Sequence, residues 1–417
     1  MVSEHANPLA TPGSVDAGGQ NVHVASLSRA LARRGHTVTV YTRRDDPEPP
    51  IRVPLCEGVD VVHVTAGPPR RIPKDELLPH MGAFAAELAA AWALETPDVV
   101  HSHFWMSGLA AMSGADGCGL SAVRPPVLHT FHALGSVKRR HQGAADTSPA
   151  ERVWLEPRVG RHADGVIATC EDEVGELRAL GIPTHHVEVA PCGVDAELFA
   201  HEGPTEARGA RFRILSVGRL VRRKGVDLVI RALALLRERG FGENGFGEVE
   251  LEIVGSGESS GADDPEIARL SALAEKFGVS EQVHFRGSLP QDRIPALLRS
   301  ADAVVCAPWY EPFGIVPLEA MACGTPVVAA AVGGLNNSVL HGVTGLHVPP
   351  RDPEAIAEAL TRLLLDRGFR EALGRAGRSR VEAEYTWDRV AERTEAIYER
   401  ALDRARHVAR RLEEAAS

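Results

Sequence analysis

Residues 309–324 have the sequence WYEPFGIVPLEAMACG and follow a short apolar run that predicts a buried strand. The stretch itself predicts a turn and then a short helix. Glu311 lies in the turn, and Glu319 lies a little over two helical turns further along. The N–H groups of Gly314 and Ile315, at the start of the helix, form a typical anion site. Carboxylates for hydroxyl groups beside amides for phosphate predict a nucleotide-sugar site.

The length and composition limit the classes of protein that are compatible with the chain. Its 417 residues exceed the size of one hydrophobic core and predict two domains. The net charge of -10 argues against nonspecific nucleic-acid binding, and the six cysteines are dispersed without a C-x-x-C motif. No apolar run approaches the ~20 residues of a membrane span. We therefore expect a cytoplasmic protein without an integral membrane segment, a zinc site or disulfides.

Apolar runs alternate with helical patterns in both halves, which predicts two doubly wound α/β domains with parallel sheets. The predicted strands lie at residues 37–41, 59–64, 98–103, 127–132, 165–169, 212–217, 249–254, 283–285, 303–307 and 326–329. A polar segment at residues 199–211 predicts the linker, so we expect domains at 1–200 and 201–385. A helix over 386–417 is expected to return to the first domain. Residues 1–3 look like the end of a strand whose beginning is missing.

Arg219 and Lys224 follow the first predicted strand of the second domain. A guanidinium fork and an ammonium group together stabilise a diphosphate leaving group. A solvated basic turn is the alternative, but the position at a strand end favours a ligand site. In the first domain, Gly18 and Gly19 precede a predicted helix and allow a phosphate or sugar to approach the backbone. Glycine pairs are common in loops, so this second signal is weak by itself.

Polar and aromatic side chains follow two strands of the first domain. They are His101, His103, Phe104 and Trp105 after one strand, and His129, Phe131 and His132 after the next. The spacing of His101 and His103 places both on one strand face, as in some metal sites. No carboxylate or cysteine nearby in the sequence completes a ligand set. We therefore expect no metal, and a pocket for a hydroxyl-rich substrate.

Lys138 lies in a basic segment, residues 134–141, and with Lys74 and Arg152 it could hold an acceptor phosphate. A solvated loop would explain the other basic residues of this segment, Arg139 and Arg140, equally well.

The sequence VGSGESSG, residues 254–261, follows a strand but does not fit a dinucleotide fingerprint. The last gap between its glycines is three residues and not two, and no acidic residue ends the next strand. Hydride transfer is therefore not supported, and without a G-x-S-x-G motif serine hydrolysis is not supported either.

Several motifs together resemble the retaining glycosyltransferases of family 4, which have the GT-B fold: two Rossmann-like domains that face each other across a cleft. They are Arg219 with Lys224, EPFGIVPLEAMACGTPVVA from Glu311, VGSGE from Val254 and DAGGQNVHV from Asp16. The resemblance runs from residue 2 to about 387. Within the family it points to the branch of the sucrose-phosphate synthases and the D-inositol-3-phosphate N-acetylglucosaminyltransferases. It implies transfer of a hexosyl unit, from a UDP-linked donor, to a small polyol, sugar or cyclitol, with or without a phosphate group.

The resemblance implies donor-binding roles for the matching second-domain residues. Arg219 and Lys224 would bind the diphosphate, beside the amides of Gly314 and Ile315. Glu319 would bind the ribose hydroxyls and Glu311 the sugar ring.

In the first domain, Gly18 and Gly19 would approach the donor phosphates, and His132 would contact the transferred sugar. In this family the acceptor attacks the face from which the leaving group departs, which retains the anomeric configuration, and the diphosphate helps to take the acceptor proton. No protein nucleophile is then required. The implied catalytic set is therefore His132, Arg219, Lys224 and Glu311. No metal or other cofactor is expected.

The acceptor residues depart from the family pattern. Lys74 and Arg152 match a lysine and an arginine that hold the acceptor phosphate in the inositol-phosphate enzymes. Phe104 replaces a tyrosine and Ala133 a threonine, so two hydroxyl donors are lost. Lys138 occupies the place of a phosphate-binding lysine of the sucrose-phosphate synthases and could compensate.

Two other functions remain open from the sequence. A catalytically silent nucleotide-sugar-binding protein is one, in view of the short first strand. A nucleotide-sugar epimerase is the other, although the first domain lacks the carboxylate-rich set that this chemistry needs. For partners we expect a nucleotide sugar and a small-molecule acceptor, no nucleic acid, and a homodimer by family analogy.

Overall fold

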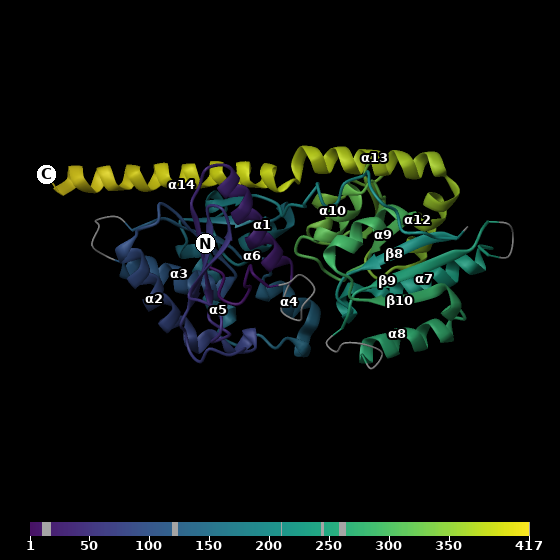
Figure 1. Cartoon of the computed structure of the whole chain (residues 1–417), viewed down its shortest axis with the longest axis horizontal. Coiled ribbons are helices and arrows are strands. Elements are labelled where there is room, and N and C mark those ends of the chain that lie inside the picture. Colours follow the sequence, from purple (N-terminus) through teal and green to yellow (C-terminus); the bar gives the residue numbers. More distant parts are fainter. Residues whose placement is uncertain (11–17, 119–123, 210, 243–245, 258–263, 417) are drawn as a thin grey trace. The chain divides into compact units, whose positions relative to one another are not determined.

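The computed structural model describes residues 1–10, 18–118, 124–209, 211–242, 246–257 and 264–416. The chain forms two compact units (Figure 1): unit 1 is Met1–Pro191 with Trp387–Ser417, and unit 2 is Cys192–Thr386. Among the described residues, no helix is both long enough and apolar enough to cross a bilayer.

The division between the units precedes the linker that was predicted at residues 199–211. Backbone groups just after Cys192 are bound within unit 2. The N–H of Val194 donates to the carbonyl of Tyr385, and the guanidinium of Arg378 donates to the carbonyl of Phe199. These long-range bonds, which local composition does not reveal, place the boundary earlier.

Unit 1 is a sheet covered by helices. Its strands are β1 (Val38–Arg43), β2 (Arg52–Cys56), β3 (Val59–Val64), β4 (Val100–His103), β5 (Val127–Thr130), β6 (Gly165–Ala168) and β7 (Val187–Val189). Its α-helices are α1 (Gly19–Arg33), α2 (Met81–Leu94), α3 (Trp105–Gly117), α4 (Gly135–Gln142), α5 (Arg152–His162), α6 (Glu171–Ala179) and α14 (Trp387–Ala416). The strand orders are β1-β3-β2 and β4-β5-β6-β7, and only β2 runs antiparallel to its neighbour.

The first three residues join the two parts of this sheet. The N–H of Val2 donates to the carbonyl of His101 in β4, and the N–H of Ser3 donates to the carbonyl of Tyr41 in β1. The predicted strand end is therefore present as a bridge in the centre of the sheet.

The C-terminal helix α14 packs against α1 within unit 1. Its buried residues Trp387, Val390, Ala391, Ile397, Tyr398 and Ala401 recur at helical spacing and join Val24, Leu27 and Leu31 in one apolar cluster. An apolar stripe of this kind keeps one face of a helix on the core, and each large side chain that it buries contributes ~1.5–3 kcal/mol.

Unit 2 is a doubly wound parallel sheet. Its strands are β8 (Phe212–Val217), β9 (Val249–Val254), β10 (Val283–Gly287), β11 (Ala303–Cys306), β12 (Val327–Ala330) and β13 (Gly345–Val348). Its α-helices are α7 (Val226–Glu238), α8 (Pro265–Lys276), α9 (Ile294–Ser300), α10 (Ile315–Ala322), α11 (Leu335–Ser338), α12 (Pro353–Leu365) and α13 (Arg367–Glu384). The strand order β10-β9-β8-β11-β12-β13 is that of the dinucleotide-binding fold.

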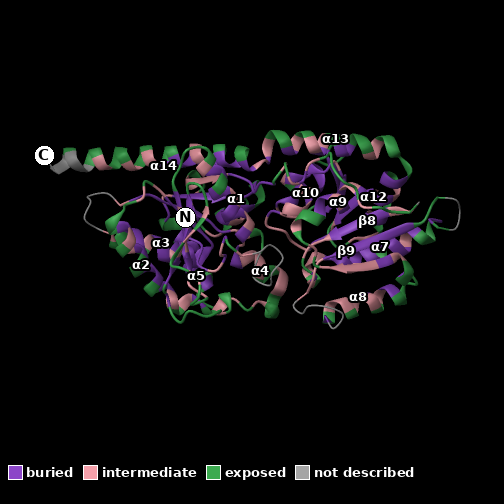
Figure 2. Ribbon diagram, in the orientation of Figure 1, coloured by how far each residue is buried: buried purple, intermediate pink, exposed green. Residues whose placement is uncertain are grey.

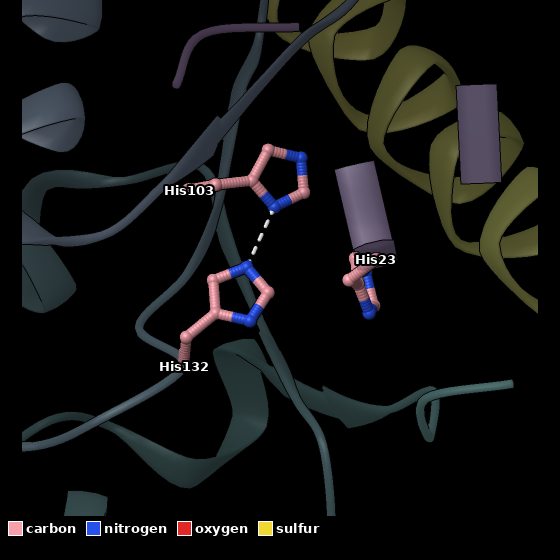
Figure 3. A group of neighbouring side chains, drawn as sticks. All are labelled: His23, His103 and His132. Atoms are coloured by element: carbon pink, nitrogen blue, oxygen red, sulfur yellow. Dashed lines mark hydrogen bonds between the residues drawn. The ribbon is translucent and has the colours of Figure 1, made fainter. Parts of the chain in front are cut away.

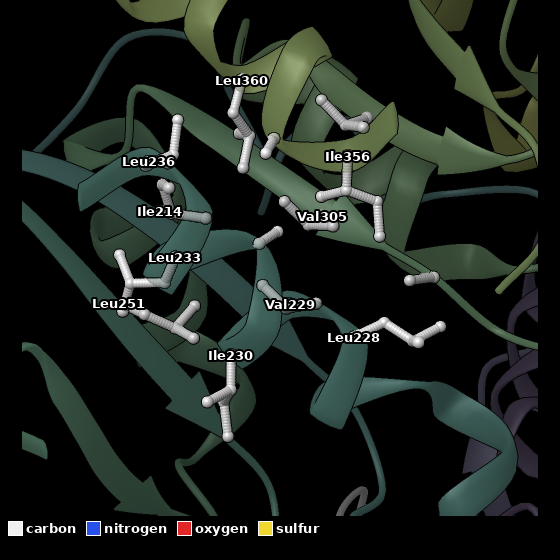
Figure 4. Packing of buried hydrophobic residues seen from close by; sticks show 14 of the residues in the cluster. Ile214, Leu228, Val229, Ile230, Leu233, Leu236, Leu251, Val305, Ile356 and Leu360 are labelled. Atoms are coloured by element: carbon white, nitrogen blue, oxygen red, sulfur yellow. The ribbon is translucent and has the colours of Figure 1, made fainter. Parts of the chain in front are cut away.

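Helices α7 and α12 bury one face of this sheet. Leu233 and Leu236 of α7 and Leu360 of α12 meet Leu251 and Val305 of the strands in a continuous apolar cluster (Figure 4). In Figure 2 strands β8 and β9 are buried, whereas the outer faces of the helices are exposed. The core holds the strand ends, which carry the candidate site, in fixed positions.

Candidate functional site

The candidate donor site of unit 2 lies at the switch point of its sheet. Strands β8 and β11 are neighbours, and the chain leaves them toward opposite edges of the sheet. A crevice for ligands opens outside the carboxyl ends of two such strands. Arg219 and Lys224 follow β8, whereas Glu311 and Gly314 follow β11, so all four belong to loops at this point.

Glycines allow the backbones of these loops to pack directly against each other, because they have no Cβ. Gly225 has φ 69°, and a Cβ there would lie 2.0 Å from the carbonyl oxygen of Ala307. A Cβ on Gly333 would lie 2.1 Å from the carbonyl oxygen of Glu311. Any side chain at either glycine would move the loops that carry the charged groups.

Gly255, the first residue after β9, also allows two loops to pack closely. A Cβ on Gly255 would lie 1.9 Å from the carbonyl oxygen of Gly218, next to Arg219. Gly255, the first glycine of the VGSGE motif, therefore belongs to the site as a packing residue. Glu258 and Ser259–Gly261 lie outside the described residues.

Lys224 and Glu311 form an ion pair in which the ammonium Nζ lies 2.5 Å from the carboxylate Oε2. Burial disfavours the charge on Glu311, but Lys224 and Arg223 outweigh that effect and lower its pKa. The carboxylate is therefore ionised and already oriented. It can accept a hydrogen bond from a sugar hydroxyl while it holds the lysine.

Glu319, on α10, is half-buried near the same strand end. Burial raises its pKa to about 7. Lys224, Glu311 and Glu319 all act electrostatically on the thiol of Cys306, the half-buried last residue of β11. The structure thus brings together the lysine and both glutamates that the sequence predicted.

The remaining predicted donor groups have the expected accessibility. Arg219 is exposed on its turn, and no hydrogen bond or ion pair to another described residue occupies its guanidinium. Gly314, with φ 83°, precedes α10, and Ile315 is the first residue of that helix. The first turn of α10 contains no acidic side chain, so its N–H groups can face an anion.

In unit 1, Gly18 and Gly19 begin α1, and Gly18 faces open space. The side chain of Gln20 donates to Ser3 Oγ and to the carbonyl of His103, both at 3.2 Å. These bonds fix the glycine turn beside the end of β4. Asp16 and Ala17 of the same motif lie outside the described residues.

Two residues near the strand ends have strained backbones. Phe104 has φ 79° and His132 has φ 59°, conformations that are uncommon for residues other than glycine. Strain of this kind concentrates at functional sites. His132 Nε2 lies 3.0 Å from His103 Nδ1, so the polar ends of β4 and β5 meet as the sequence predicted.

Two groups of side chains among the described residues have a spacing that could hold a metal ion: His23, His103 and His132, and Glu250, Glu252 and His284. Figure 3 shows the first group, to which α1 contributes His23. Nothing in the local sequence pattern linked His23 to the other two histidines. A metal-independent enzyme remains a prediction.

The candidate acceptor cations already have carboxylate partners. Lys138 Nζ lies 2.9 Å from Asp146 Oδ1, and Arg152 pairs with Glu156 at 2.8 Å. Although burial opposes the charge on Asp146, its hydrogen bonds with Lys138 and with Ser148 lower its pKa to about 2. An ionised carboxylate therefore lies beside Lys138 at physiological pH.

Arg152 is buried, and its guanidinium lies 5.0 Å from the centroid of the Phe104 ring. Lys138 and Arg152 are brought together, because both donate to Ser148 Oγ, at 3.0 and 3.3 Å. Lys74 is exposed, next to Asp75 in the same cluster.

The basic segment at residues 134–141 is mostly helix α4, which corrects the alternative of a solvated loop. Arg140 makes two hydrogen bonds with Glu176, at 2.6 and 2.8 Å. Its charge therefore holds α4 to α6.

Two family models match the chain. The model described as "Glycosyltransferase Family 4" matches residues 17–198, and the one described as "Glycosyl transferases group 1" matches residues 201–380. A D-inositol 3-phosphate glycosyltransferase of Kribbella flavida is 37% identical over 415 residues, which are 97% of this chain and 95% of that protein. The enzyme of the same name from Acidothermus cellulolyticus is 37% identical, over 98% of this chain and 91% of that protein.

Solved structures have the same fold. Sucrose-phosphate synthase from Thermosynechococcus elongatus has a TM-score of 0.83 and 31% identity, covering 96% of this chain and 97% of that one. Anabaena HepE in complex with UDP and glucose has a TM-score of 0.70 and 18% identity, covering 95% and 97%. These matches confirm the predicted fold class of two Rossmann-like α/β domains.

Proposed function

Because the chain belongs to glycosyltransferase family 4, we propose that it is a retaining enzyme that moves a hexosyl unit from a UDP-linked sugar to a small polyol, sugar or cyclitol. The observation that carries this proposal is the set of Lys224, Glu311 and Glu319 at the switch point of unit 2. Lys224 would bind the diphosphate, Glu311 the sugar and Glu319 the ribose, so the set matches the three parts of a nucleotide sugar.

The ion pair of Lys224 and Glu311 supports group transfer in preference to binding alone. Negative charge grows on the diphosphate as the sugar leaves, and an ammonium that is already positioned stabilises it in the transition state. Glu311 fixes that ammonium and at the same time can orient a sugar hydroxyl. Arg219, exposed on the same turn, supplies a second cation.

Support for the donor and the mechanism comes from the relatives. HepE is solved with UDP and glucose, and the relatives at 37% identity are named glycosyltransferases. In the retaining route that we propose, the diphosphate leaves, and the acceptor attacks from the same face and loses its proton to the departing diphosphate. The protein then needs to position both substrates and stabilise charge, and no side chain has to form a covalent bond.

For the acceptor we propose a small hydroxyl-rich molecule, with or without a phosphate group. The relatives named for D-inositol 3-phosphate favour a cyclitol. The structure bears on the phosphate, because Lys138 and Arg152 must share or exchange their carboxylate partners before they can bind one.

An assay of UDP release from a panel of UDP-sugars, with and without acceptors, tests the proposal. We expect release that requires an acceptor, and NMR of the product should show the anomeric configuration of the donor. Saturable donor binding without turnover for every acceptor would identify a silent binding protein, and interconversion of donors without acceptor would identify an epimerase.

A further inference from the structure

A series of contacting polar side chains in unit 1 leads from the C-terminal helix to His132. Tyr398 on α14 lies 2.7 Å from Nδ1 of His101, although the two residues are 297 positions apart in sequence. Nε2 of His101 lies 2.9 Å from Oγ1 of Thr130. The rings of His101 and His103 contact each other with centroids 4.1 Å apart and planes tilted by 38°, and His103 Nδ1 lies 3.0 Å from His132 Nε2.

The proton positions on Thr130, His101 and Tyr398 follow from their hydrogen-bond partners. Oγ1 of Thr130 lies 3.0 Å from the carbonyl oxygen of Ile167, and only the threonine can supply the proton of that bond. The threonine therefore accepts from Nε2–H of His101. Burial, with the histidines nearby, lowers the pKa of His101 well below its usual value, so the ring is neutral and its Nδ1 accepts from the hydroxyl of Tyr398.

The position of the proton on His103 follows from a buried ring nitrogen. Nε2 of His103 is fully buried and has no hydrogen-bond partner among the described residues. An unpaired buried N–H is rarer than an unpaired acceptor. The proton of His103 is therefore on Nδ1, from which it is donated to Nε2 of His132.

The proton of a neutral His132 must then be on Nδ1, the nitrogen that points away from His103 in Figure 3. Burial, and to a smaller extent the neighbouring histidines, lower the pKa of His132 well below its usual value, in agreement with a neutral ring. An N–H group on this nitrogen is a donor for a sugar hydroxyl or ring oxygen.

We propose that Tyr398, His101 and His103 are positioning residues that hold His132 as a neutral imidazole with its proton on Nδ1, ready to donate to the transferred sugar. The sugar contact rests on the proposed function, whereas the proton positions do not. Tyr398 acts by holding His101 against His103, so a residue of the C-terminal helix α14 supports the histidine that would face the sugar.

NMR of protein labelled with ¹⁵N-histidine tests the proton positions without any substrate. We expect His101 to be protonated on Nε2 and His132 on Nδ1, with signals assigned through His101→Gln and His132→Asn variants. In Tyr398→Phe, His101 should lose the hydrogen-bond shift of Nδ1. A wild-type His132 that carries its proton on Nε2 would overturn the inference.

Kinetics test the consequence for the sugar. Tyr398→Phe removes one neutral hydrogen bond from the group that positions His132, so we expect kcat to fall about fivefold while the donor KM stays unchanged. Thr394→Val is the matched control, because the buried hydroxyl of this threonine on the same helix donates to the carbonyl of Val390 and has no other hydrogen bond with the described residues. The control should keep its kcat; equal kcat values for the two variants would contradict the role of Tyr398.

A second pair of variants, His132→Asn and His132→Ala, distinguishes the effect of the hydrogen-bond donor at residue 132 from the effect of side-chain size. The amide nitrogen of asparagine lies where Nδ1 of histidine lies, and asparagine tolerates the positive φ of His132. We expect His132→Asn to keep at least about fivefold more kcat than His132→Ala. If the two variants are equal, His132 does not act through an Nδ1–H. Absence of transfer in the wild type would refute the proposed function alone, since NMR would still decide the proton positions.

Discussion

The two candidate half-sites use opposite electrostatics. The donor site of unit 2 is charged: it contains an ion pair, an exposed arginine and a glutamate whose pKa burial raises to about 7. The histidine cluster of unit 1 is neutral, because burial lowers the pKa values of His23, His101, His103 and His132. We infer that charge is placed where a diphosphate leaves, and uncharged hydrogen-bonding groups where a sugar is held.

The largest effect is expected at the ion pair of the charged half-site. Lys224→Ala removes the cation for the diphosphate and leaves Glu311 without its partner, so kcat/KM should fall by about 10²–10³. Steady-state UDP release measures the loss, and circular dichroism checks the fold. Arg222→Ala, an exposed arginine on the same turn, is the control and should stay within about twofold of wild type. Unchanged turnover of Lys224→Ala would break the contrast between the half-sites.

The stability of the loops that carry the charged half-site should depend on Gly225. Gly225→Ala places a Cβ against the carbonyl of Ala307 in a left-handed conformation, so it should destabilise unit 2 by about 3 kcal/mol. Urea unfolding measures the change. Gly368→Ala in α13, where the nearest atom is 3.6 Å away, is the matched control and should be neutral or slightly stabilising. Equal stabilities would show that the loops are not locked through this contact.

Glu319 predicts a pH dependence of the charged half-site. With a pKa raised by burial to about 7, the carboxylate is protonated below that pH and accepts ribose hydroxyls poorly. The donor KM should therefore rise about tenfold per pH unit below 7, and Glu319→Gln should remove this slope.

The same shift affects stability with a definite sign. The folded state binds this proton more tightly than the unfolded state, whose pKa is 4.5, so the contribution of Glu319 to stability falls as the pH rises from about 4.5 to about 7. Thermal unfolding of Glu319→Gln against wild type isolates this contribution. A donor KM that is flat between pH 6 and 8 would contradict the assigned role.

The smallest predicted effect concerns the acceptor cations. Asp146→Asn removes the closer of the two carboxylates beside Lys138, and Asp75 remains 3.9 Å from the Lys138 ammonium. We expect kcat/KM for a phosphorylated acceptor to rise about fivefold relative to the same acceptor without phosphate. Paired assays with inositol and inositol phosphate measure the ratio. An unchanged ratio would mean that Lys138 does not meet the phosphate.

The sequence predicted the strands that carry the site, because buried parallel strands are continuous apolar runs. β3, β8 and β9 have the predicted bounds. It missed β2, β7 and β13, which are short or lie at sheet edges where half-exposed residues interrupt the apolar pattern. It also predicted that Lys224, Glu311 and Glu319 would converge, since the carboxyl ends of neighbouring strands share one edge.

By itself the sequence determined the family, the doubly wound sheets and the charged residues of the donor half-site, because motif, apolar period and strand end are local properties of the chain. Only the tertiary structure brought His23 and Tyr398 to the histidines, pressed Gly255 and Gly333 against the loops of the site, and paired Lys138 with Asp146. These contacts join residues from different elements, and their partners are chosen by packing and burial.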